Sequence, residues 1–473
     1  MADHRAPQRP PKYRLAARVL WRLTGYPAQE VLGVLEHSQW WPPGKLVEFR
    51  NDKFRRLIRH CYDQVPYYRG VMERLGLGPG DFRELRDLPK LPVLTKDLFR
   101  ANQESLQARS IPQSRTNASR TGGTTGEPIV VRRTRNDAVW QNQCYARGLS
   151  WGGLAPHMQR ISLFGGSLGQ RAQQSWPKKL WHRFADTSIL LPAFQLSGHN
   201  VNDYLDRIEA SGCRHLIGYA SAVYMLAVLS EQVARRLGLE TVFPTAEQMP
   251  EAWKAKVNCI LGGQALCYYG CGEVNSLGYQ CRQGEAYHRC DEHAVLEVMN
   301  GDGSASFEGE GPLLISDLDS YAMPILRYAN GDCGALSDTP CACGRSGGLI
   351  TRLGGRVNDF LVTRAGERIS GAIAPHTFRH VRGAVFYQYV QDRPGSVTVR
   401  VVTNEQYQQE LEERRIRGIL RDTLGADTEV LFEYPPDIER TPAGKARFVI
   451  NNYLASSAPV AGGGTVIPGA CRG

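Results

Sequence analysis

Ten consecutive residues in the second hundred of the chain have a composition suited to binding phosphate. They are Ser119-Arg120-Thr121-Gly122-Gly123-Thr124-Thr125-Gly126-Glu127-Pro128, followed by a run of β-formers. Glycine leaves backbone N–H groups uncovered, and successive N–H groups form a concave anion site that threonine hydroxyls can extend. Because no Gly-Lys-Ser/Thr follows the glycines, the loop is not a Walker A motif. A phosphate-binding loop and a hairpin turn rich in glycine and threonine remain the two interpretations.

Two later stretches could contact the base and the sugar of a nucleotide. In Tyr269-Gly270-Cys271-Gly272-Glu273, the ring could stack on a base, the glycines allow close approach, and the carboxylate could hold Mg²⁺. In Arg327-Tyr328-Ala329-Asn330-Gly331-Asp332, the carboxylate of Asp332 could accept the two hydroxyls of a ribose. Each stretch could equally be an ordinary turn, because a glycine after a strand and Asn-Gly-Asp are both common turn sequences.

Two C-terminal stretches could provide a hinge between domains and a positive charge for the reacting phosphate. In Gly354-Gly355-Arg356-Val357-Asn358-Asp359, Arg356 could reach ribose or phosphate and Asp359 could be a hinge between rigid bodies. Lys445 lies on a loop containing glycine, from which its ammonium group could enter a site and neutralise a phosphoryl transition state. The alternatives are a polar linker and a surface lysine.

Cysteine and histidine residues form a candidate metal set. Cys281 precedes His288 in a short loop, and Cys341-Ala342-Cys343 lies just beyond the Asn-Gly-Asp turn. Three thiolates and one imidazole are a tetrahedral zinc set, and two ligands on each of two distant loops would make a closed, structural site. Four unconnected reduced side chains are the alternative. Cys290 and His293 compete for one ligand position, and Cys333 is a further, less well placed candidate.

The hydrophobic pattern predicts a parallel sheet that positions these groups. Strands that end in turns are expected at residues 160–166, 215–221, 241–243 and 266–269, with helices at 136–149, 222–237 and 250–261. This alternation favours an α/β fold with largely parallel strands, whose ligands bind at the carboxyl ends of the strands. The residues expected to line a substrate pocket there are Phe164, Gly165, Gly218, Tyr219, Ser221 and Glu247.

The length of the chain and its changing pattern predict two domains. A chain of 473 residues is too long for one core. An N-terminal extension (1–44) should precede a large domain (45–356), which begins with an amphipathic helix over 45–62 and has short alternating strands from 294 onwards. A small domain (357–455) with a helix over 406–424 follows. The tail (456–473) is of low complexity and is expected to be disordered.

Composition and charge exclude several classes of function. The net charge is +10, with lysine and arginine spread along the chain, whereas a nucleic-acid binder more often has a concentrated basic face. Such a charge instead suits anionic small molecules. No apolar run is long enough to span a bilayer, and no signal core follows the basic N-terminus. With twelve cysteines expected to be reduced, these features predict a cytoplasmic protein that binds no nucleic acid.

The five stretches, in this order, resemble the acyl-adenylate-forming superfamily of acyl and aryl coenzyme A ligases, luciferases and peptide-synthetase adenylation domains. Val65-Pro66-Tyr67-Tyr68 and the stretch over 216–221 make the chain most similar to the phenylacetate–coenzyme A ligase family, from about residue 45 to 453. The resemblance implies a large N-terminal α/β domain with parallel and mixed sheets and a β-rich subdomain. A small, mobile α+β C-terminal domain would complete the fold.

The resemblance also implies a role for each matched residue. Tyr269, beside Gly270, would stack on adenine, Glu273 would bind Mg²⁺, and Asp332 would take the ribose hydroxyls with Arg356 beside it. The residues that would close on the outer phosphates of ATP are Thr121, Gly122, Gly123, Thr124, Thr125 and Gly126. The hinge would be Asp359, and Lys445 would bridge the substrate carboxylate and the α-phosphate. Catalysis would rest on Lys445, Glu273 and Thr121.

The sequence departs from the superfamily pattern at two places. Cys271 and Gly272 stand where relatives often carry serine or threonine, which puts hydroxyl contacts there in doubt. Ala329-Asn330 replaces the commoner neighbours of the aspartate that follows, which alters fine positioning at the ribose.

The implied activity is ATP-dependent conversion of a carboxylic acid to acyl-AMP, with release of pyrophosphate, followed by transfer to the thiol of coenzyme A. The implied cofactors are ATP, Mg²⁺, coenzyme A as co-substrate, and structural zinc. Transfer to an amine or a carrier-protein thiol, and an adenylylating synthetase, are alternative enzymes. A non-catalytic, zinc-containing scaffold for polysaccharide or secondary-metabolite assembly is the alternative outside catalysis. The identity of the acid and the formation of a homodimer stay open.

Overall fold

The computed structural model describes most of the chain between Pro27 and Tyr453. The described ranges are 27–120, 129–156, 158–164, 188–356, 360–370, 377–378, 381–438 and 447–453. None of the helices in these ranges combines the length and the apolar composition needed to cross a bilayer.

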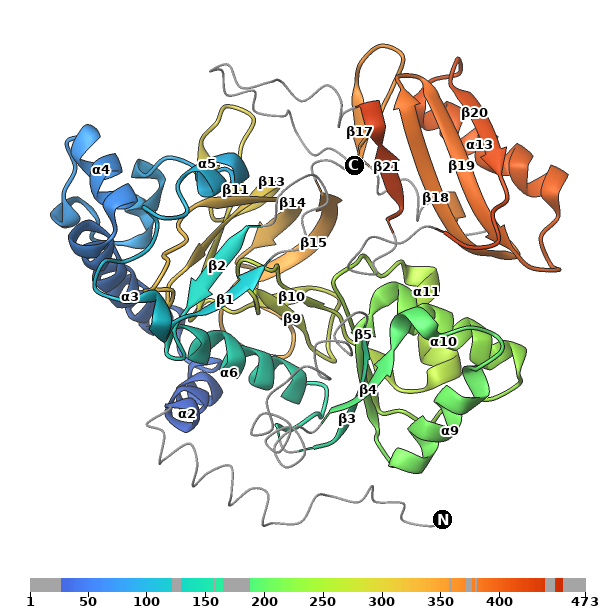
Figure 1. The fold of residues 1–473 in the computed structure, drawn as a ribbon, viewed down its shortest axis with the longest axis horizontal. Helices are drawn as coiled ribbons and strands as arrows, with labels where there is room; N and C mark the ends of the chain where they lie inside the picture. The colour runs from blue at the N-terminus through green and yellow to red at the C-terminus, as the bar shows by residue number, and fades with distance from the viewer. Residues whose placement is uncertain are drawn as a thin grey trace.

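A five-stranded parallel sheet forms one half of the large domain (Figure 1). Its strands, in spatial order, are β4 (Ser188–Pro192), β3 (Arg160–Phe164), β5 (His215–Tyr219), β6 (Thr241–Thr245) and β7 (Gln264–Ala265). All neighbouring strands run parallel, as the sequence predicted. The chain leaves β3 towards β4 on one side and continues from β5 towards β6 on the other. This reversal is the topological switch point of a doubly wound sheet.

The parallel sheet is buried on both faces, and alternate side chains of its strands enter different cores. Leu216 packs into a core with the helices α9 (Val201–Ser211), α10 (Ala220–Gln232) and α11 (Glu251–Leu261). Ile217 packs into the opposite core with α2 (Ala28–Ser38) and α6 (Asp137–Ser150). Both faces of a central parallel strand are therefore apolar, which explains the continuous hydrophobic run of β5.

Helix α10 ends five residues earlier than the sequence pattern predicts. Ala234 has a φ of +54°, and the N–H of Arg235 donates to the carbonyl of Ser230. This hydrogen bond and the left-handed residue form the usual terminus of a helix, although glycine more often occupies that position. The apolar residues after it, such as Leu237, belong to the connection and pack into the core from there.

An antiparallel sheet of eight strands forms the other half of the large domain. Its strands, in spatial order, are β12 (Ala305–Ser306), β11 (Ala294–Met299), β13 (Gly309–Asp317), β14 (Tyr328–Ser337), β15 (Leu349–Arg356), β10 (Tyr287–Arg289), β9 (Gly278–Gln280) and β8 (Tyr268–Tyr269). The expected strand over 266–269 is split between the two sheets. Gln264–Ala265 pairs parallel with β6, whereas Tyr268–Tyr269 pairs antiparallel with β9. The chain crosses from one sheet to the other at Leu266 and Cys267, a change that the apolar run alone does not reveal.

The N-terminal helices cover the antiparallel sheet. Helix α3 (Pro43–Gln64) has its apolar face, including Phe54 and Leu57, in one core with Val295 and Ile315 of the sheet. This helix extends the amphipathic segment predicted from the sequence by two residues at each end. Further short elements are α4 (Pro66–Arg74), α5 (Lys96–Ala101), η1 (Pro79–Asp81), η2 (Leu85–Lys90), η3 (Gln113–Arg115), η4 (Ala193–Gln195) and the antiparallel hairpin β1 (Asn117–Arg120) with β2 (Val130–Arg133).

The small C-terminal domain is α+β, as predicted. Its sheet has the spatial order β20 (Glu429–Glu433), β19 (Ser396–Thr403), β18 (Ala384–Arg393) and β21 (Val449–Asn451). Helix α13 (Gln409–Leu424) packs Ile416 and Leu420 against this sheet, and the hairpin of β16 (Phe360–Val362) and β17 (Arg368–Ser370) precedes it.

Aromatic side chains join the two domains, which lie side by side in Figure 1. Trp253 of α11 stacks on Tyr224 of α10, with ring centroids 4.2 Å apart. It also meets Phe386 and Phe448 of the small domain, with centroids 5.4 Å and 5.2 Å away. Only 4% of Trp253 is exposed, so its burial depends on both domains.

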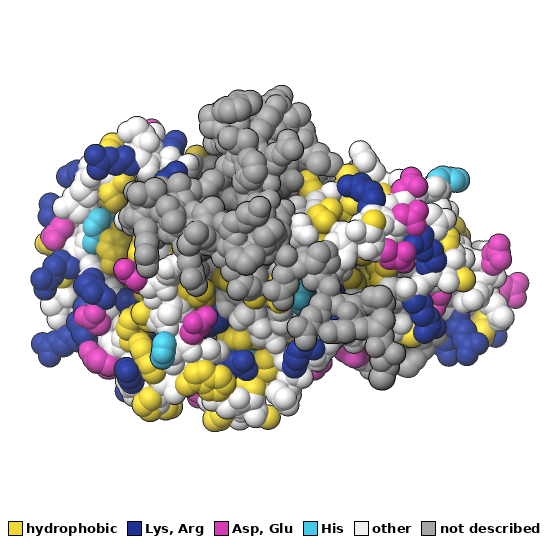
Figure 2. All heavy atoms as spheres, turned by 90° about the horizontal axis from the view of Figure 1, so that it is seen from below, with side chains coloured by type: hydrophobic (Ala, Val, Ile, Leu, Met, Phe, Trp, Pro, Cys, Tyr) yellow, Lys and Arg dark blue, Asp and Glu magenta, His cyan; other side chains and the backbone are white. Residues whose placement is uncertain are grey.

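Charged side chains of both signs are interleaved on the face of the molecule seen in Figure 2. The surface ion pairs of the protein include Arg235 with Asp206 at 2.7 Å and Arg393 with Glu429 at 2.6 Å. The positive charge on this face is dispersed, as it is along the sequence.

Candidate active site

The carboxyl ends of β3 and β5 meet at the switch point of the parallel sheet. Phe164 ends β3 and Tyr219 ends β5, and their rings meet edge to face with centroids 5.0 Å apart. A Cβ on Gly218 would lie 2.8 Å from the carbonyl oxygen of Leu163, so only glycine fits between these strands. Three residues of the predicted pocket thus lie together where doubly wound sheets bind ligands.

Helix α10 begins at this same edge, and Glu247 caps it. The Ser221 N–H donates to Glu247 Oε2 at 2.8 Å, and a carboxylate at a helix N-terminus is stabilised by the free N–H groups and the helix dipole. Burial, together with the Glu247 carboxylate, raises the pKa of Tyr219, which keeps its hydroxyl protonated. Within the described part of the chain, the buried Oγ of Ser221 has no hydrogen-bond partner.

Tyr269, Asn330 and Asp332 form a hydrogen-bonded triangle. The Tyr269 hydroxyl donates to Asp332 Oδ2 at 2.8 Å, while Asn330 Nδ2 donates to that hydroxyl at 3.0 Å and to Asp332 Oδ2 at 2.6 Å. Burial and then the Asp332 carboxylate raise the pKa of Tyr269 well above its ordinary value, so the hydroxyl remains a donor. The ring predicted to stack on adenine therefore touches the carboxylate predicted to bind ribose.

The parallel sheet brings this triangle close to the switch point. Thr245, the last residue of β6, donates from Oγ1 to the carbonyl of Tyr268 at 3.2 Å. After Tyr269 the chain turns at Gly270, where a Cβ would lie 2.6 Å from Asn275 Oδ1. The predicted nucleotide residues thus follow directly from the edge that carries the predicted acid pocket.

Glu273 is held from two sides. Tyr328 donates its hydroxyl to Glu273 Oε1 at 3.0 Å, and Arg133 Nη2 donates to the Glu273 carbonyl. Arg133 also faces the carboxylate of Asp317 at 3.6 Å. Because Arg133 ends β2, it attaches the hairpin that carries the glycine/threonine stretch to the turn of Glu273. Glu273 is 8% exposed, and the hard oxygen donors of its carboxylate suit Mg²⁺.

Several predicted positions lie outside the described residues, and their roles stay predictions. They are Thr121, Gly122, Gly123, Thr124, Thr125, Gly126, Gly165, Asp359 and Lys445. The strands that flank the glycine/threonine stretch are described, with Arg120 opposite Val130. In the pairing of β14 with β15, Arg356 lies opposite Asp332, so the backbone register makes these two residues neighbours.

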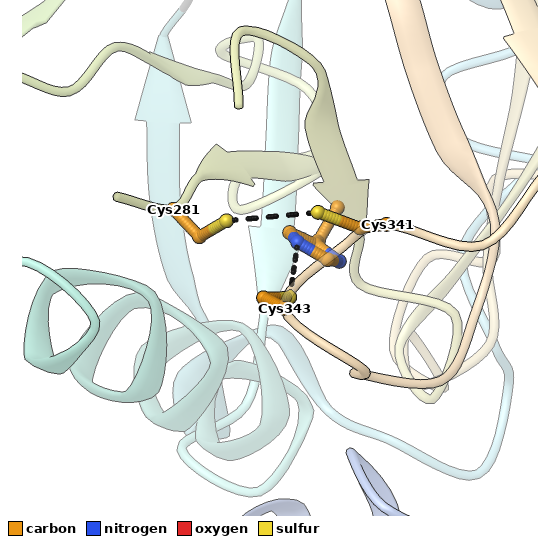
Figure 3. Close-up of side chains that lie close together, drawn as sticks. Cys281, Cys341 and Cys343 are labelled. Atoms are coloured by element: carbon orange, nitrogen blue, oxygen red, sulfur yellow. Dashed lines mark hydrogen bonds between the residues drawn. The ribbon is translucent and has the colours of Figure 1, made fainter. Parts of the chain in front are cut away.

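Cys281, His288, Cys341 and Cys343 converge on one point (Figure 3). Their four ligand atoms all lie within 4.8 Å of one another. The sulfurs of Cys281 and Cys341 are 3.8 Å apart, and Cys343 Sγ lies 3.3 Å from His288 Nε2. Tetrahedral zinc with Zn–S bonds of about 2.3 Å requires sulfurs about 3.8 Å apart. The set therefore fits zinc in both size and donor type.

The N-terminal segment supports this set. Gln39 Oε1 accepts hydrogen bonds from Trp151 Nε1 and from Arg345 Nε, both at 3.0 Å. The Arg345 guanidinium lies 4.9 Å from the Trp151 ring, whose edge meets His288 with centroids 5.2 Å apart. Burial, together with nearby arginines, lowers the pKa of His288 to about 4, so its imidazole is neutral at physiological pH.

The structure separates the competing ligands from this set. Burial alone would lower the pKa of His293, but the carboxylates of Asp317 and Asp319 raise it to about 9. His293 Nδ1 lies 2.9 Å from Asp319, which also pairs with Lys53 at 2.6 Å. This cluster is an ion-pair network whose cations are side chains. Cys290 contacts Cys144, and Cys333 lies in β14 opposite Gly355.

Three residues of the site received no role from the sequence: Arg133, Tyr328 and Asn330. Tyr328 and Asn330 stand inside a stretch whose aspartate was recognised, and the spacing of Asn330 and Asp332 was the available signal. For Arg133 no comparable signal exists, because its partners Glu273 and Asp317 are distant in sequence.

Known proteins resemble the chain in sequence and in fold. Residues 361–452 match the family described as the CapK C-terminal domain. The phenylacetate–coenzyme A ligase of Thermus thermophilus is 27% identical over 449 residues, which cover 87% of this chain and 97% of that protein. Protein CapK of Staphylococcus aureus is 22% identical over 86% of this chain and 89% of its own length.

Solved structures of 2-hydroxyisobutyryl-CoA ligase share the fold. The structure in the postadenylation state with 2-HIB-AMP matches with a TM-score of 0.72 at 17% identity, covering 89% of this chain and 94% of that one. The same ligase in the thioesterification state matches with a TM-score of 0.59.

The two domains define a protein with the fold of the acyl-adenylate-forming superfamily. Over most of its length the chain is similar in sequence to phenylacetate–coenzyme A ligases, in agreement with the motifs that its sequence carries.

Proposed function

We propose that this chain activates a carboxylic acid as acyl-AMP and transfers the acyl group to coenzyme A. The observation that carries the proposal is the contact of Tyr269 with Asp332, together with Glu273, beside the switch point. Homologous ligases that cover almost the whole chain support it. A cytoplasmic location, where ATP and coenzyme A are available, belongs to the same proposal.

In the first step, a carboxylate oxygen of the acid attacks the α-phosphorus of ATP, and the bond to the β-phosphate breaks to release pyrophosphate. In the second, the thiol sulfur attacks the acyl carbon and AMP leaves. Glu273 would hold Mg²⁺, which screens the phosphates, while residues 121–126 clamp the outer phosphates. Lys445 would neutralise charge in the first step, and the small domain (357–455) would rotate about Asp359 against the large domain (45–356) before the second.

The acid would occupy the pocket at the switch point. Phe164 and Tyr219 present two aromatic rings there, which favours an acid with a flat apolar group. Ser221 and Glu247 lie at the adjoining helix terminus and would select among polar substituents.

Pyrophosphate release with a panel of aryl, arylacetic and aliphatic acids tests the proposal. Product masses obtained with coenzyme A, with amines or with a carrier protein identify the acceptor. Lys445→Ala should reduce adenylation strongly, whereas Lys256→Ala, which removes a lysine paired with Glu231, should not. ATP binding without pyrophosphate release for any acid would favour the non-catalytic scaffold.

Zinc at the four-residue set is the second part of the proposal. Elemental analysis of purified protein should find zinc equimolar with the chain. Cys341→Ser should lose the metal, while Cys259→Ser, which changes an exposed cysteine, should retain it. Equal zinc content in both variants would contradict the assignment.

A further inference from the structure

Asn330 stands where the antiparallel sheet departs from regular pairing. Leu314 of β13 pairs with Ala329 of β14, and Pro312 pairs with Cys333. Between these two pairs β13 advances by two residues, whereas β14 advances by four. Gly331 lies in this bulge with a φ of +87°, a conformation that favours glycine. Bulges of this kind redirect side chains near functional sites. Here the bulge turns Asn330 and Asp332 towards the same tyrosine.

The Asn330 side chain contacts both of the predicted nucleotide-binding residues. Its Nδ2 donates to the Tyr269 hydroxyl and to Asp332 Oδ2, and its Oδ1 accepts from the Asp332 N–H at 3.0 Å. These contacts need two donor hydrogens and an acceptor on one short side chain. An amide supplies them, whereas a carboxylate supplies only acceptors.

We propose that Asn330 is a positioning residue that holds the Tyr269 ring and the Asp332 carboxylate as one unit for nucleotide recognition. Stacking on the base and hydrogen bonding to the ribose then depend on each other. The inference rests on the proposed function for the identity of the nucleotide as ATP, but it requires no chemistry after binding.

The physical reason is preorganisation of a charged acceptor. Two donors, from Tyr269 and Asn330, meet on Asp332 Oδ2 and set the orientation of that carboxylate before a ligand binds. Hydrogen bonds to an ionised group are about twice as strong as neutral ones. Without them the carboxylate must be ordered by the ligand, which weakens its preference for a complete ribose diol.

Calorimetric binding of ATP, 2′-deoxy-ATP and 3′-deoxy-ATP to the full chain tests this role. Wild-type protein should prefer ATP over both analogues. Asn330→Ala and Tyr269→Phe should each reduce that preference roughly tenfold. Asn300→Ala is the matched control, because Asn300 donates to Ser304 Oγ in a different turn and should keep the full preference.

Asn330→Asp guards against collapse of the turn, because it keeps the side-chain size and the acceptor for the Asp332 N–H, while it replaces the Nδ2 donor with a negatively charged oxygen. It should lose the preference as Asn330→Ala does. Unchanged discrimination in the folded Asn330 variants and in Tyr269→Phe would overturn the positioning role, even with normal pyrophosphate release. A different result would overturn the proposed activity alone. In that result wild-type protein prefers ATP and the variants lose the preference, but no acid supports pyrophosphate release. Equal binding of all three nucleotides by wild-type protein would overturn the positioning role and leave pyrophosphate release as the separate test of the proposed activity.

Discussion

Removal of the Trp253 indole should separate the two domains. This ring contacts Tyr224 of the large domain and Phe386 and Phe448 of the small one. Trp253→Ala leaves Tyr224 without its stacking partner and opens a gap opposite both small-domain rings. We therefore expect the docked arrangement to lose population while each domain keeps its own core.

The expected loss of docking free energy follows from how the contacts of Trp253 are divided between the two domains. Truncation of a buried tryptophan to alanine costs about 3–5 kcal/mol in total. The stack on Tyr224 lies within the large domain, whereas the pairs with Phe386, Phe448 and Tyr387 cross between the domains. Each aromatic pair contributes about 0.5–1.5 kcal/mol. With three pairs across the domain boundary, the docked arrangement should lose about 1.5–4.5 kcal/mol, a factor between about 10 and 2000 in its equilibrium.

Small-angle scattering measures this change directly, because undocking increases the radius of gyration. Phe378→Ala is the matched control, since Phe378 stacks on Tyr387 within the small domain, with centroids 4.0 Å apart. A double-mutant cycle of Trp253→Ala with Phe386→Ala isolates their coupling. An unchanged radius of gyration in a folded Trp253→Ala protein would refute the argument that this ring holds the domains together.

Three further outcomes are expected. Glu273→Gln should reduce pyrophosphate release at least ~100-fold while ATP still binds, because the change removes a charge that would hold Mg²⁺; equal release would contradict that role. Arg147→Met should lower the free energy of unfolding in urea by ~3–5 kcal/mol, because it leaves the buried Glu292 carboxylate, now 2.6 Å from Arg147, unpaired. Adding Glu292→Gln should restore part of the loss. The folded pKa of His293, about 9, exceeds the ordinary value of 6.5, so its contribution is complete below pH 6.5 and is lost as the pH rises through about 9. Stability should therefore fall by ~3 kcal/mol over this window, and His293→Gln should flatten the profile.

The sequence by itself determined the elements whose signals are local. The apolar spacing of α3 and α13 and the strand–turn–helix order around β3, β5 and β6 follow from periodicities of 3.6 and 2 residues. The turn that follows Tyr269 and carries Glu273 was also readable, because glycine marks it, whereas Asp332 lies at a bulge inside β14 and not in a hairpin turn. These properties depend on neighbours within a few residues, which is the range that a sequence pattern samples.

The tertiary structure alone decided what depends on distant partners. The separation of β7 from β8 and the early end of α10 interrupt apolar runs that look continuous in sequence. Cys281 lies in the candidate metal set, whereas His293 lies beside the carboxylates of Asp317 and Asp319, because strand pairing placed different neighbours beside each. Asn330 acquired its partners through a bulge between strands. Such choices depend on which surfaces pack together, and the free energy of that packing is a property of the whole fold.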